Sequence, residues 1–256
     1  MKQEKRRVAI ITGASRGIGK AIALKLDKNG FIPILVSRSR GDLKKALKDF
    51  GKKAVAIPMD VSREKEIVKM VQKVVKEFGR VDVLINNVGI TEVGILGVGS
   101  PERRGCDQLT KEDFDQMVNT NLGGTFFCMR ECIKQMKKQK RGGQIININS
   151  IVAKNLFPFK NFKRRSLYIA TKAALSHLAT AVQTETEEFG IKISTIYPGL
   201  VFTEGEASKG IFDIEKLRKF ALRPADIAHI VWMILEQGES SNITEVVVYP
   251  RFSSLL

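Results

Sequence analysis

Tyr168 and Lys172 lie four positions apart in a stretch whose hydrophobic pattern predicts a helix, Ser166–Phe189, so their side chains share one helical face. An ordinary tyrosine has a pKa of about 10, which is high for proton exchange at neutral pH. A neighbouring ammonium group favours the phenolate and lowers this pKa. Ser150 ends the apolar run Gln144–Asn149 and can donate to a carbonyl oxygen. These residue types suit proton transfer to or from the oxygen of a carbonyl or an alcohol.

A glycine-rich stretch near the amino end, Thr12–Gly19, is suited to binding phosphate. It follows the apolar run Val8–Ile11, which predicts a buried strand, and leads into Lys20–Leu26, which predicts an amphipathic helix. Glycines let the backbone turn tightly and approach a ligand closely, and the free N–H groups of the new helix favour an anion. A tight turn without a ligand is the alternative, because the spacing Gly-x-x-x-Gly-x-Gly differs from the usual dinucleotide fingerprint.

Apolar and amphipathic stretches alternate along the chain, which is typical of repeated β-α units. Such units form a parallel sheet with helices on both faces. We therefore predict an α/β fold, a single doubly wound parallel sheet of about seven strands in one domain covering residues 1–256. The predicted strands are Val8–Thr12, Ile32–Ser37, Ala54–Pro58, Val81–Asn86, Gln144–Asn149, Lys192–Tyr197 and Glu245–Val248. The predicted helices are Gly17–Asn29, Asp42–Phe50, Arg63–Phe78, Lys111–Lys138, Ser166–Phe189 and Pro224–Glu236.

Several motifs follow one another in an order that resembles the short-chain dehydrogenase/reductase family, over nearly the whole chain. They are Thr12-Gly13-Ala14-Ser15-Arg16-Gly17-Ile18-Gly19, Asp60-Val61, Asn86-Asn87-Val88-Gly89, Asn119–Gly123, Ser150, Tyr168-x-x-x-Lys172 and Pro198-Gly199-Leu200-Val201-Phe202-Thr203. A tyrosine and a lysine at this spacing also occur by chance, whereas the ordered set is specific. The resemblance implies a Rossmann-type NAD(P)-binding domain that transfers a hydride between a nicotinamide and a carbonyl or secondary alcohol.

The resemblance also implies a role for each matching residue. Asn121, Ser150, Tyr168 and Lys172 match the catalytic set, in which Asn121 holds a water that connects Lys172 to solvent. The residues that match cofactor-contacting positions are Gly13, Ser15, Arg16, Gly17, Ile18, Gly19, Ser37, Arg38, Asp60, Val61, Asn87, Gly89, Tyr168, Lys172, Pro198, Gly199, Val201 and Thr203. Asp60 also has a structural interpretation at the start of the next helix, where Ser62 is a candidate N-cap. The chemistry requires no metal.

The end of the second predicted strand favours NADP(H) over NAD(H). NAD-selective sites usually place an acidic residue there for the adenosine ribose, but this chain has Ser37 followed by Arg38. A carboxylate would repel a 2′-phosphate, whereas the guanidinium groups of Arg16 and Arg38 would pair with it. The alternative is that Arg38 and Arg40 are ordinary surface charges.

The loops at 90–109, 151–166 and 203–222 are expected to form the substrate side. Residues 90–109 are glycine-rich and longer than expected for the family, which predicts a mobile loop over the substrate entrance; a second phosphate cradle is the weaker alternative. The insertion 155–165 contains three Phe and four basic residues. It either binds an aromatic or acyl group and an anion or forms a packed surface loop. The last strand departs from the family at Glu245, which puts the usual C-terminal subunit contacts in doubt.

Reduction of a carbonyl with NADPH, reversible as alcohol oxidation, is the leading functional hypothesis. A 3-oxoacyl thioester is a candidate substrate, although Phe189 stands before Gly190 where acyl-carrier-protein reductases often have Arg. A non-catalytic NADP-binding sensor on the same fold is a second hypothesis, which the retained catalytic set opposes. The net charge of +16, from 43 Lys and Arg against 27 Asp and Glu, suggests nucleic acid. No nucleic-acid-binding motif accompanies this charge, so a solvated surface is the simpler interpretation.

A homodimer or homotetramer is expected from two helices, Lys111–Lys138 and Ser166–Phe189, which carry apolar or small residues on more than one face. These residues include Phe126, Phe127, Ala173, Ala174 and Leu178. The family resemblance also implies pairing through these helices. We therefore predict a small-molecule substrate and a second copy of this chain as the partners.

The composition of the chain bears on its cellular location, on disulfide bonds and on metal binding. No apolar run approaches the roughly 20 residues of a membrane span, and the amino end lacks the pattern of a secretory signal, so we expect a cytoplasmic protein. Three cysteines without a Cys-x-x-Cys spacing argue against a disulfide framework. Cys128 and Cys132 are expected to be buried apolar residues rather than metal ligands, and His177 and His229 stand singly in helical stretches.

Overall fold

The computed structural model describes residues 6–91, 105–154, 165–203 and 214–251. These residues form a seven-stranded sheet in the order β3-β2-β1-β4-β5-β6-β7, and all neighbouring strands are parallel. The strands are β1 Val8–Thr12, β2 Ile32–Ser37, β3 Val55–Pro58, β4 Val83–Asn86, β5 Gly143–Ile148, β6 Ile191–Pro198 and β7 Glu245–Val248. The predicted doubly wound α/β fold is confirmed. The strand order reverses between β1 and β4, where sheets of this kind bind ligands.

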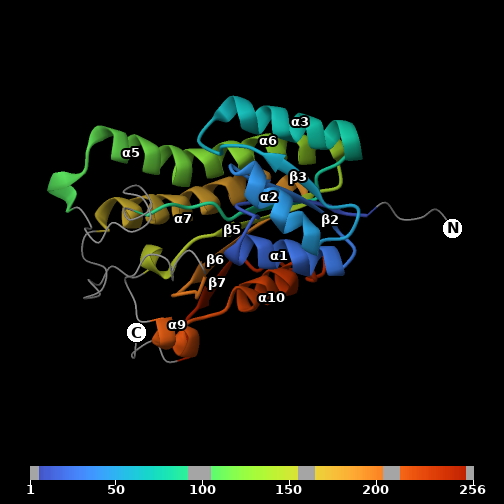
Figure 1. Cartoon of the computed structure of the whole chain (residues 1–256). Helices are drawn as coiled ribbons and strands as arrows, with labels where there is room; N and C mark the ends of the chain where they lie inside the picture. The colour runs from blue at the N-terminus through green and yellow to red at the C-terminus, as the bar shows by residue number, and fades with distance from the viewer. Residues whose placement is uncertain (1–5, 92–104, 155–164, 204–213, 252–256) are drawn as a thin grey trace.

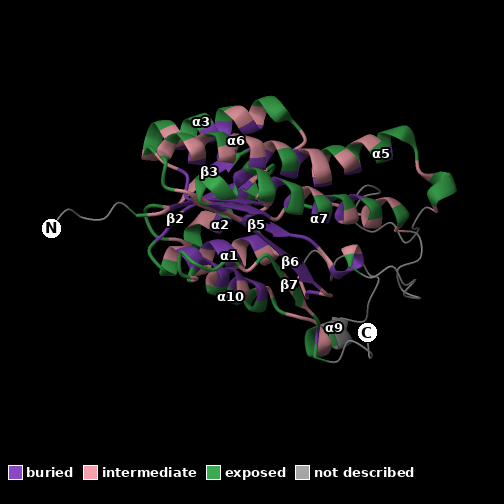
Figure 2. Cartoon of the chain, turned by 180° about the vertical axis from the view of Figure 1, so that it is seen from behind, coloured by how far each residue is buried: buried purple, intermediate pink, exposed green. Residues whose placement is uncertain are grey.

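Helices cover both faces of the sheet (Figure 1). One face shares an apolar core with α1 (Gly17–Lys28), α2 (Arg40–Ala46) and α10 (Pro224–Leu235). The other face shares a core with α3 (Glu64–Phe78), α6 (Gly124–Gln139) and α7 (Ser166–Thr186). Figure 2 shows the buried strands between the two layers. Because β1 is enclosed on both faces, it consists of Val-Ala-Ile-Ile-Thr with all five residues buried.

The predicted continuous helix Lys111–Lys138 is wrong as a single element. It divides into α5 (Lys111–Val118), a π-helical turn (Asn119–Gly123) and α6. Two close contacts accompany the interruption. The side chain of Asn121 bonds to the backbone of Ile90, and a Cβ atom at Gly124 would lie only 2.8 Å from the carbonyl oxygen of Val61. Such π turns are frequent at functional sites.

The candidate N-cap Ser62 is also wrong. α3 begins at Glu64 with Arg63 as its N-cap residue. Ser62 instead donates to Asp60 Oδ1 through its backbone N (3.0 Å) and its Oγ (2.9 Å). Since Asp60 forms this local turn, its side chain orders the connection after β3.

Two connections at the amino edge of the sheet are short turns between a helix and a strand. α3 returns to β4 through Gly79, whose φ is 76°, and α7 returns to β6 through Gly190, whose φ is 67°. Both angles lie in the left-handed region, which glycine enters without the steric cost of a side chain. Both turns therefore depend on glycine.

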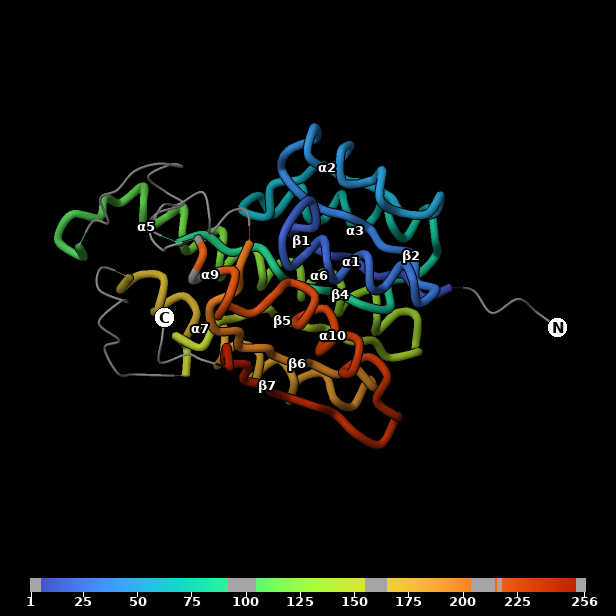
Figure 3. Tube along the Cα trace, turned by 60° about the horizontal axis from the view of Figure 1, so that its bottom comes forward, coloured from blue at the N-terminus to red at the C-terminus, as the bar shows by residue number. Residues whose placement is uncertain are grey.

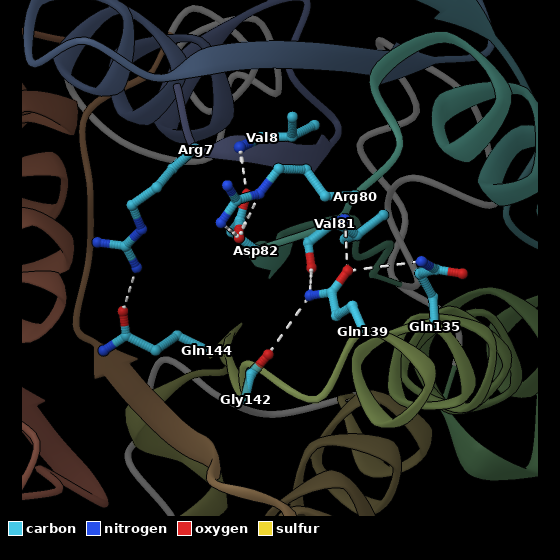
Figure 4. Close-up of polar contacts among 9 residues, drawn as sticks. All are labelled: Arg7, Val8, Arg80, Val81, Asp82, Gln135, Gln139, Gly142 and Gln144. Atoms are coloured by element: carbon cyan, nitrogen blue, oxygen red, sulfur yellow. Dashed lines mark hydrogen bonds and ion pairs between the residues drawn. The ribbon is translucent and has the colours of Figure 1, made fainter. Parts of the chain in front are cut away.

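Side-chain hydrogen bonds reinforce the amino edge (Figure 4). Asp82 Oδ2 accepts from the backbone N of Val8 (2.7 Å) and Asp82 Oδ1 accepts from Arg80 Nε (2.9 Å), which links β1 to the start of β4. Gln139, at the end of α6, accepts from the backbone N of Val81 (3.2 Å) and donates to its carbonyl oxygen (2.7 Å). The edge is therefore held by side chains as well as by the strand ladder.

The opposite, carboxyl edge carries the longer connections. The first turns of α5 and α7 and the short helix α9 (Ile214–Phe220) lie at this end, away from the amino terminus (Figure 3). Most of the predicted substrate loops, at 92–104, 155–164 and 204–213, lies outside the described residues. None of the helices in the described ranges has the length and apolar character needed to cross a bilayer.

Candidate active site

Lys172 is the buried charged residue at the centre of the candidate site. It is 4 % exposed, and its Nζ donates to the carbonyl oxygen of Ile148 at the end of β5 (3.1 Å). Burial lowers the pKa of Lys172 to about 8, because removal from water disfavours the ammonium form. Tyr168 lies one turn earlier on α7, half-buried, with its ring centroid 5.9 Å from Lys172 Nζ. The structure thus places the predicted tyrosine and lysine beside each other.

Ser150 stands where β5 meets α7. The preceding residue, Asn149, is buried and donates to the carbonyl oxygen of Lys172 and to Ser176 Oγ, both at 3.1 Å. Ser150 caps the short turn that follows, with its Oγ accepting from the backbone N of Val152 (3.4 Å). Asn149 and Ser176 were not among the predicted site residues. The alternation of asparagine and isoleucine in this otherwise apolar strand was the available signal for Asn149.

Asn121 reaches the same place from the π-helical turn. Its Oδ1 accepts from the backbone N of Ile90 (2.8 Å), and its Nδ2 donates to the Ile90 carbonyl oxygen (2.9 Å) and to Thr171 Oγ1 (3.2 Å). A Cβ atom at Gly89 would lie 3.4 Å from Lys172 Nζ and 3.8 Å from Asn121 Oδ1. The end of β4, the π turn and α7 therefore converge at Gly89, and the predicted catalytic residues share one region.

The glycine loop between β1 and α1 is closely packed. Gly13 and Gly17 have φ angles of 66° and 55°. A Cβ atom at Gly19 would lie 2.4 Å from the Gly13 carbonyl oxygen and 2.6 Å from Asn87 Nδ2, so the loop has no room for a side chain there. Asn87 Nδ2 donates to the carbonyl oxygens of Thr12 (3.0 Å) and Gly13 (3.3 Å). This amide joins the loop to the end of β4.

The first turn of α1 is suited to an anion. Its N-cap residue, Arg16, makes no side-chain capping bond, and the turn, which lies wholly within the described residues, has no acidic side chain. Its N–H groups can therefore face a phosphate without competition from a neighbouring carboxylate. Ile18 in the same turn packs against the core. A Cβ atom at Gly17 would lie 3.3 Å from Thr203 Cγ2, so Thr203, which follows β6, borders the loop.

The hydroxyl groups of Ser15 and Ser37 meet at 3.1 Å, across the ends of β1 and β2. Arg16 and Arg38 are both exposed. This edge therefore offers two hydroxyls and two guanidinium groups, a donor set that fits a phosphate ester.

The remaining predicted contacts lie along the same edge of the sheet. Pro198 ends β6, and the backbone N of Gly199 donates to the carbonyl oxygen of Val248 (2.7 Å). Val201 is 7 % exposed and packs in the core beside α10. Val61 is likewise buried, at 5 % exposed, against the opposite core.

A family model for short-chain dehydrogenases matches residues 7–211 of the 256-residue chain. The chain belongs to the short-chain dehydrogenase family. It is 32 % identical to an uncharacterized oxidoreductase of Staphylococcus haemolyticus over 245 residues, or 95 % of this chain and 97 % of the relative. It is 33 % identical over 200 residues to a 3-oxoacyl-(acyl-carrier-protein) reductase of Staphylococcus epidermidis, or 77 % and 75 % of the two chains. A solved metagenomic short-chain oxidoreductase in complex with NADP superposes with a TM-score of 0.78 at 28 % identity, covering 96 % and 97 %.

The family assignment confirms the resemblance drawn from the motifs and makes this short-chain dehydrogenase an oxidoreductase. Two of these relatives match almost the whole chain, so the likeness includes both the glycine loop and the α7 region.

The cysteine and histidine side chains of this short-chain dehydrogenase were considered as possible metal ligands. Cys128 and Cys132 are both buried, as predicted, and burial raises the pKa of Cys128 to about 12. His177 and His229 are exposed. Within the described ranges, no three His, Cys, Asp or Glu side chains are grouped so that they could hold a metal ion.

Lys172→Met should stabilise the cofactor-free protein at neutral pH. The folded-state pKa of Lys172, about 8, lies below its ordinary value of 10.5. At a pH below both pKa values the side chain is charged in the folded and the unfolded protein, and burial of the ammonium therefore opposes folding. This burial costs about 3 kcal/mol of folding free energy, at about 1.4 kcal/mol per pKa unit. Lys172→Met removes that cost, but loss of the hydrogen bond to Ile148 offsets about 1 kcal/mol of the gain in stability. Stability of the wild type should rise with pH from about 8 to 10.5, because the unfolded state then binds more protons.

Urea unfolding at pH 7 and pH 9 measures both effects. The wild type should gain roughly 1 kcal/mol between these values, and the variant should lack that gain. Equal pH dependence in the two proteins would show that Lys172 is not buried in this way.

Proposed function

We propose that this short-chain dehydrogenase is an NADP(H)-dependent carbonyl reductase that also oxidises secondary alcohols in the reverse direction. The observation that carries the proposal is the buried ammonium of Lys172, 4 % exposed, one helical turn from Tyr168 at the carboxyl edge of the sheet. The glycine loop opens at the same edge. A bound nicotinamide cofactor would supply hydride for the carbonyl carbon, or accept it in reverse.

Tyr168 is the proton donor in this proposal. The Lys172 ammonium stabilises the phenolate of Tyr168, so the hydroxyl can give up its proton near neutral pH. Ser150, fixed beside α7 by Asn149, donates to the substrate oxygen and orients it. The proton and the hydrogen bond thus reach the same oxygen from two sides.

Asn121 and Lys172 restore the proton in this proposal. Asn121 bonds to Thr171, next to Lys172, and its Oδ1 lies near the same point at Gly89 as Lys172 Nζ. A water held at this place would connect Lys172 with solvent, and Lys172 would also bond the nicotinamide ribose.

NADP(H) is the proposed cofactor because of the donors at the ends of β1 and β2. Arg16, Arg38, Ser15 and Ser37 offer positive charge and hydroxyl groups, and a carboxylate that would repel a 2′-phosphate is replaced by Ser37. The related metagenomic oxidoreductase was solved with NADP. Asp60, Val61, Asn87, Gly89, Pro198, Gly199, Val201 and Thr203 complete the proposed contacts.

A substrate panel with NADPH tests the proposed function. The panel contains benzaldehyde, acetophenone, ribose and acetoacetyl-coenzyme A, and NADPH absorbance reports turnover. Turnover of the thioester above the others would assign the enzyme to 3-oxoacyl reduction, which the Staphylococcus epidermidis relative supports by its name. NADPH binding without turnover of any member would favour a cofactor sensor and contradict the proposal.

We expect a homodimer or homotetramer in solution. Phe114 is 50 % exposed on α5 and Phe126 is 39 % exposed on α6, and exposed aromatic rings on adjacent helices favour contact with a second copy. Multi-angle light scattering at micromolar concentration should give at least twice the monomer mass of 28.5 kDa. A monomer mass alone would exclude this assembly.

A further inference from the structure

A chain of polar side chains runs beside Ser150 on the α7 side of the sheet. Ser176 Oγ donates to Tyr197 Oη (3.0 Å), which donates to Glu245 Oε1 (2.7 Å), and Glu245 Oε2 pairs with Lys154 Nζ (2.6 Å). Asn149 joins the chain by donating to Ser176 Oγ (3.1 Å). We call these five residues the Tyr197 network. Asn149 and Lys154 come from the connection after β5, and the other three come from α7, β6 and β7.

The Tyr197 network holds both ends of the turn that begins at Ser150. Asn149, one residue before Ser150, is bonded to α7 through Lys172 and Ser176. Lys154, four residues after Ser150, is bonded to β7 through Glu245. The two anchors are joined inside the protein by the Tyr197 hydroxyl. The position of Ser150 relative to α7 is therefore fixed from both sides.

Tyr197 is the central member of the network. Its side chain is fully buried on β6, where an apolar residue would fill the space without desolvating a hydroxyl. The hydroxyl is fully used, since it accepts from Ser176 and donates to Glu245. The Nζ of Lys154 also lies 4.7 Å from the centre of the Tyr197 ring. Buried hydrogen bonds of this kind help to specify one arrangement of the elements that they join, although Asn149 Oδ1 has no hydrogen-bond partner among the described residues.

The Lys154–Glu245 ion pair at the end of the network contributes little to the stability of the fold, but it orients the hydrogen bonds of Tyr197. Lys154 and Glu245 are 34 % and 40 % exposed, and pairs of such exposure stabilise a fold only weakly. The hydrogen bond from Lys154 lowers the pKa of Glu245, so its carboxylate is ionised at neutral pH and accepts from Tyr197. The pair thereby sets the direction of the buried hydrogen bonds.

We propose that Tyr197 is a positioning residue for carbonyl reduction, which holds Ser150 against α7 through Ser176, Asn149, Glu245 and Lys154. This inference rests on the proposed function, because it gives Ser150 a bond to the substrate oxygen. It adds Tyr197 and Glu245 to the residues on which turnover depends, although neither is expected to touch substrate or cofactor.

Paired variants test this positioning role. Tyr197→Phe should lower kcat about tenfold on the best substrate of the panel, since small displacements of an orienting group reduce turnover strongly. Its effect should fall below about twofold in a Ser150→Ala background, because two residues that act through one contact are not additive. Glu245→Gln keeps an acceptor for Tyr197 and should retain more activity than Glu245→Leu. NADPH affinity, measured by fluorescence, should not change in Tyr197→Phe.

Hydrogen–deuterium exchange gives a readout that does not depend on turnover. Residues 149–154 should take up deuterium faster in Tyr197→Phe than in the wild type, while β1 should not change. The matched control is Glu64→Leu, which breaks the Arg130–Glu64 pair between α6 and α3 at a similar distance (2.7 Å) and exposure (31 % and 48 %). This control should leave both turnover and exchange at 149–154 unchanged.

The outcomes separate the two proposals. A wild type that turns over no panel member would overturn the proposed function, and this inference with it. If the wild type is active, an equal loss from Tyr197→Phe with and without Ser150 would overturn the positioning role alone. Unchanged exchange at 149–154 in Tyr197→Phe would also overturn it.

Discussion

Tyr168→Phe should lower kcat by about 10²–10⁴-fold, the contribution expected of a general acid. The change removes the hydroxyl and keeps the ring, so the packing of α7 and the burial of Lys172 should persist. NADPH binding should therefore remain close to that of the wild type. Stopped-flow turnover and fluorescence titration of NADPH measure the two quantities on the same protein.

The control for this prediction is Tyr249→Phe. Tyr249 follows β7 and is 45 % exposed, so loss of its hydroxyl should leave kcat unchanged. A Tyr168→Phe variant with near-normal kcat would remove Tyr168 from the reaction. Weak NADPH binding by the same variant would instead assign the hydroxyl to the cofactor.

The second large effect concerns the choice of cofactor. Wild-type protein should prefer NADPH over NADH by at least about tenfold in kcat/KM. Each charge-assisted bond from Arg16 or Arg38 contributes about 1.5–3 kcal/mol before solvent screening, and screening reduces this because both side chains are exposed. The double variant Ser37→Asp with Arg38→Leu should reverse the order, because it adds repulsion and removes attraction.

Of the two substitutions, Ser37→Asp has the better-defined surroundings. Its hydroxyl lies 3.1 Å from that of Ser15, so an aspartate there would face the end of β1 and the glycine loop. The matched control is Arg40→Leu, which removes an exposed arginine two positions further on and should leave the preference intact. Equal use of NADH and NADPH by the wild type would mean that Arg16 and Arg38 are ordinary surface charges.

The periodicity of the chain predicted the strands well because a parallel sheet buries both faces of each strand. Val8–Ile11 is apolar without interruption for this reason, and Ile145–Ile148 is apolar except for the buried Asn147. The same reasoning placed Tyr168 and Lys172 on one helical face. It failed at Asn121, because the π turn depends on a bond to Ile90, which is distant in sequence.

The sequence likewise did not predict the polar contacts between residues that are distant in the chain. Glu245 was interpreted as a departure from the family at the start of the last strand, and Tyr197 only as the last residue of a predicted strand. Their hydrogen bond joins residues 48 positions apart, and no local pattern encodes such a pairing. The substrate loops within 92–104, 155–164 and 204–213 remain predictions, since they lie outside the described residues.

The two edges of the sheet should differ in how well they tolerate inserted residues. The amino edge contains the glycine turns at Gly79 and Gly190 and the side-chain bonds of Asp82 and Gln139. Added residues at the amino edge would displace left-handed turns and break the bonds that align β1 with β4. Added residues at the carboxyl edge would lengthen connections that already extend beyond the strands. Substrate loops exchanged between related enzymes should therefore be accepted at one edge only, so new specificity can be grafted without redesigning the turns that fix the sheet.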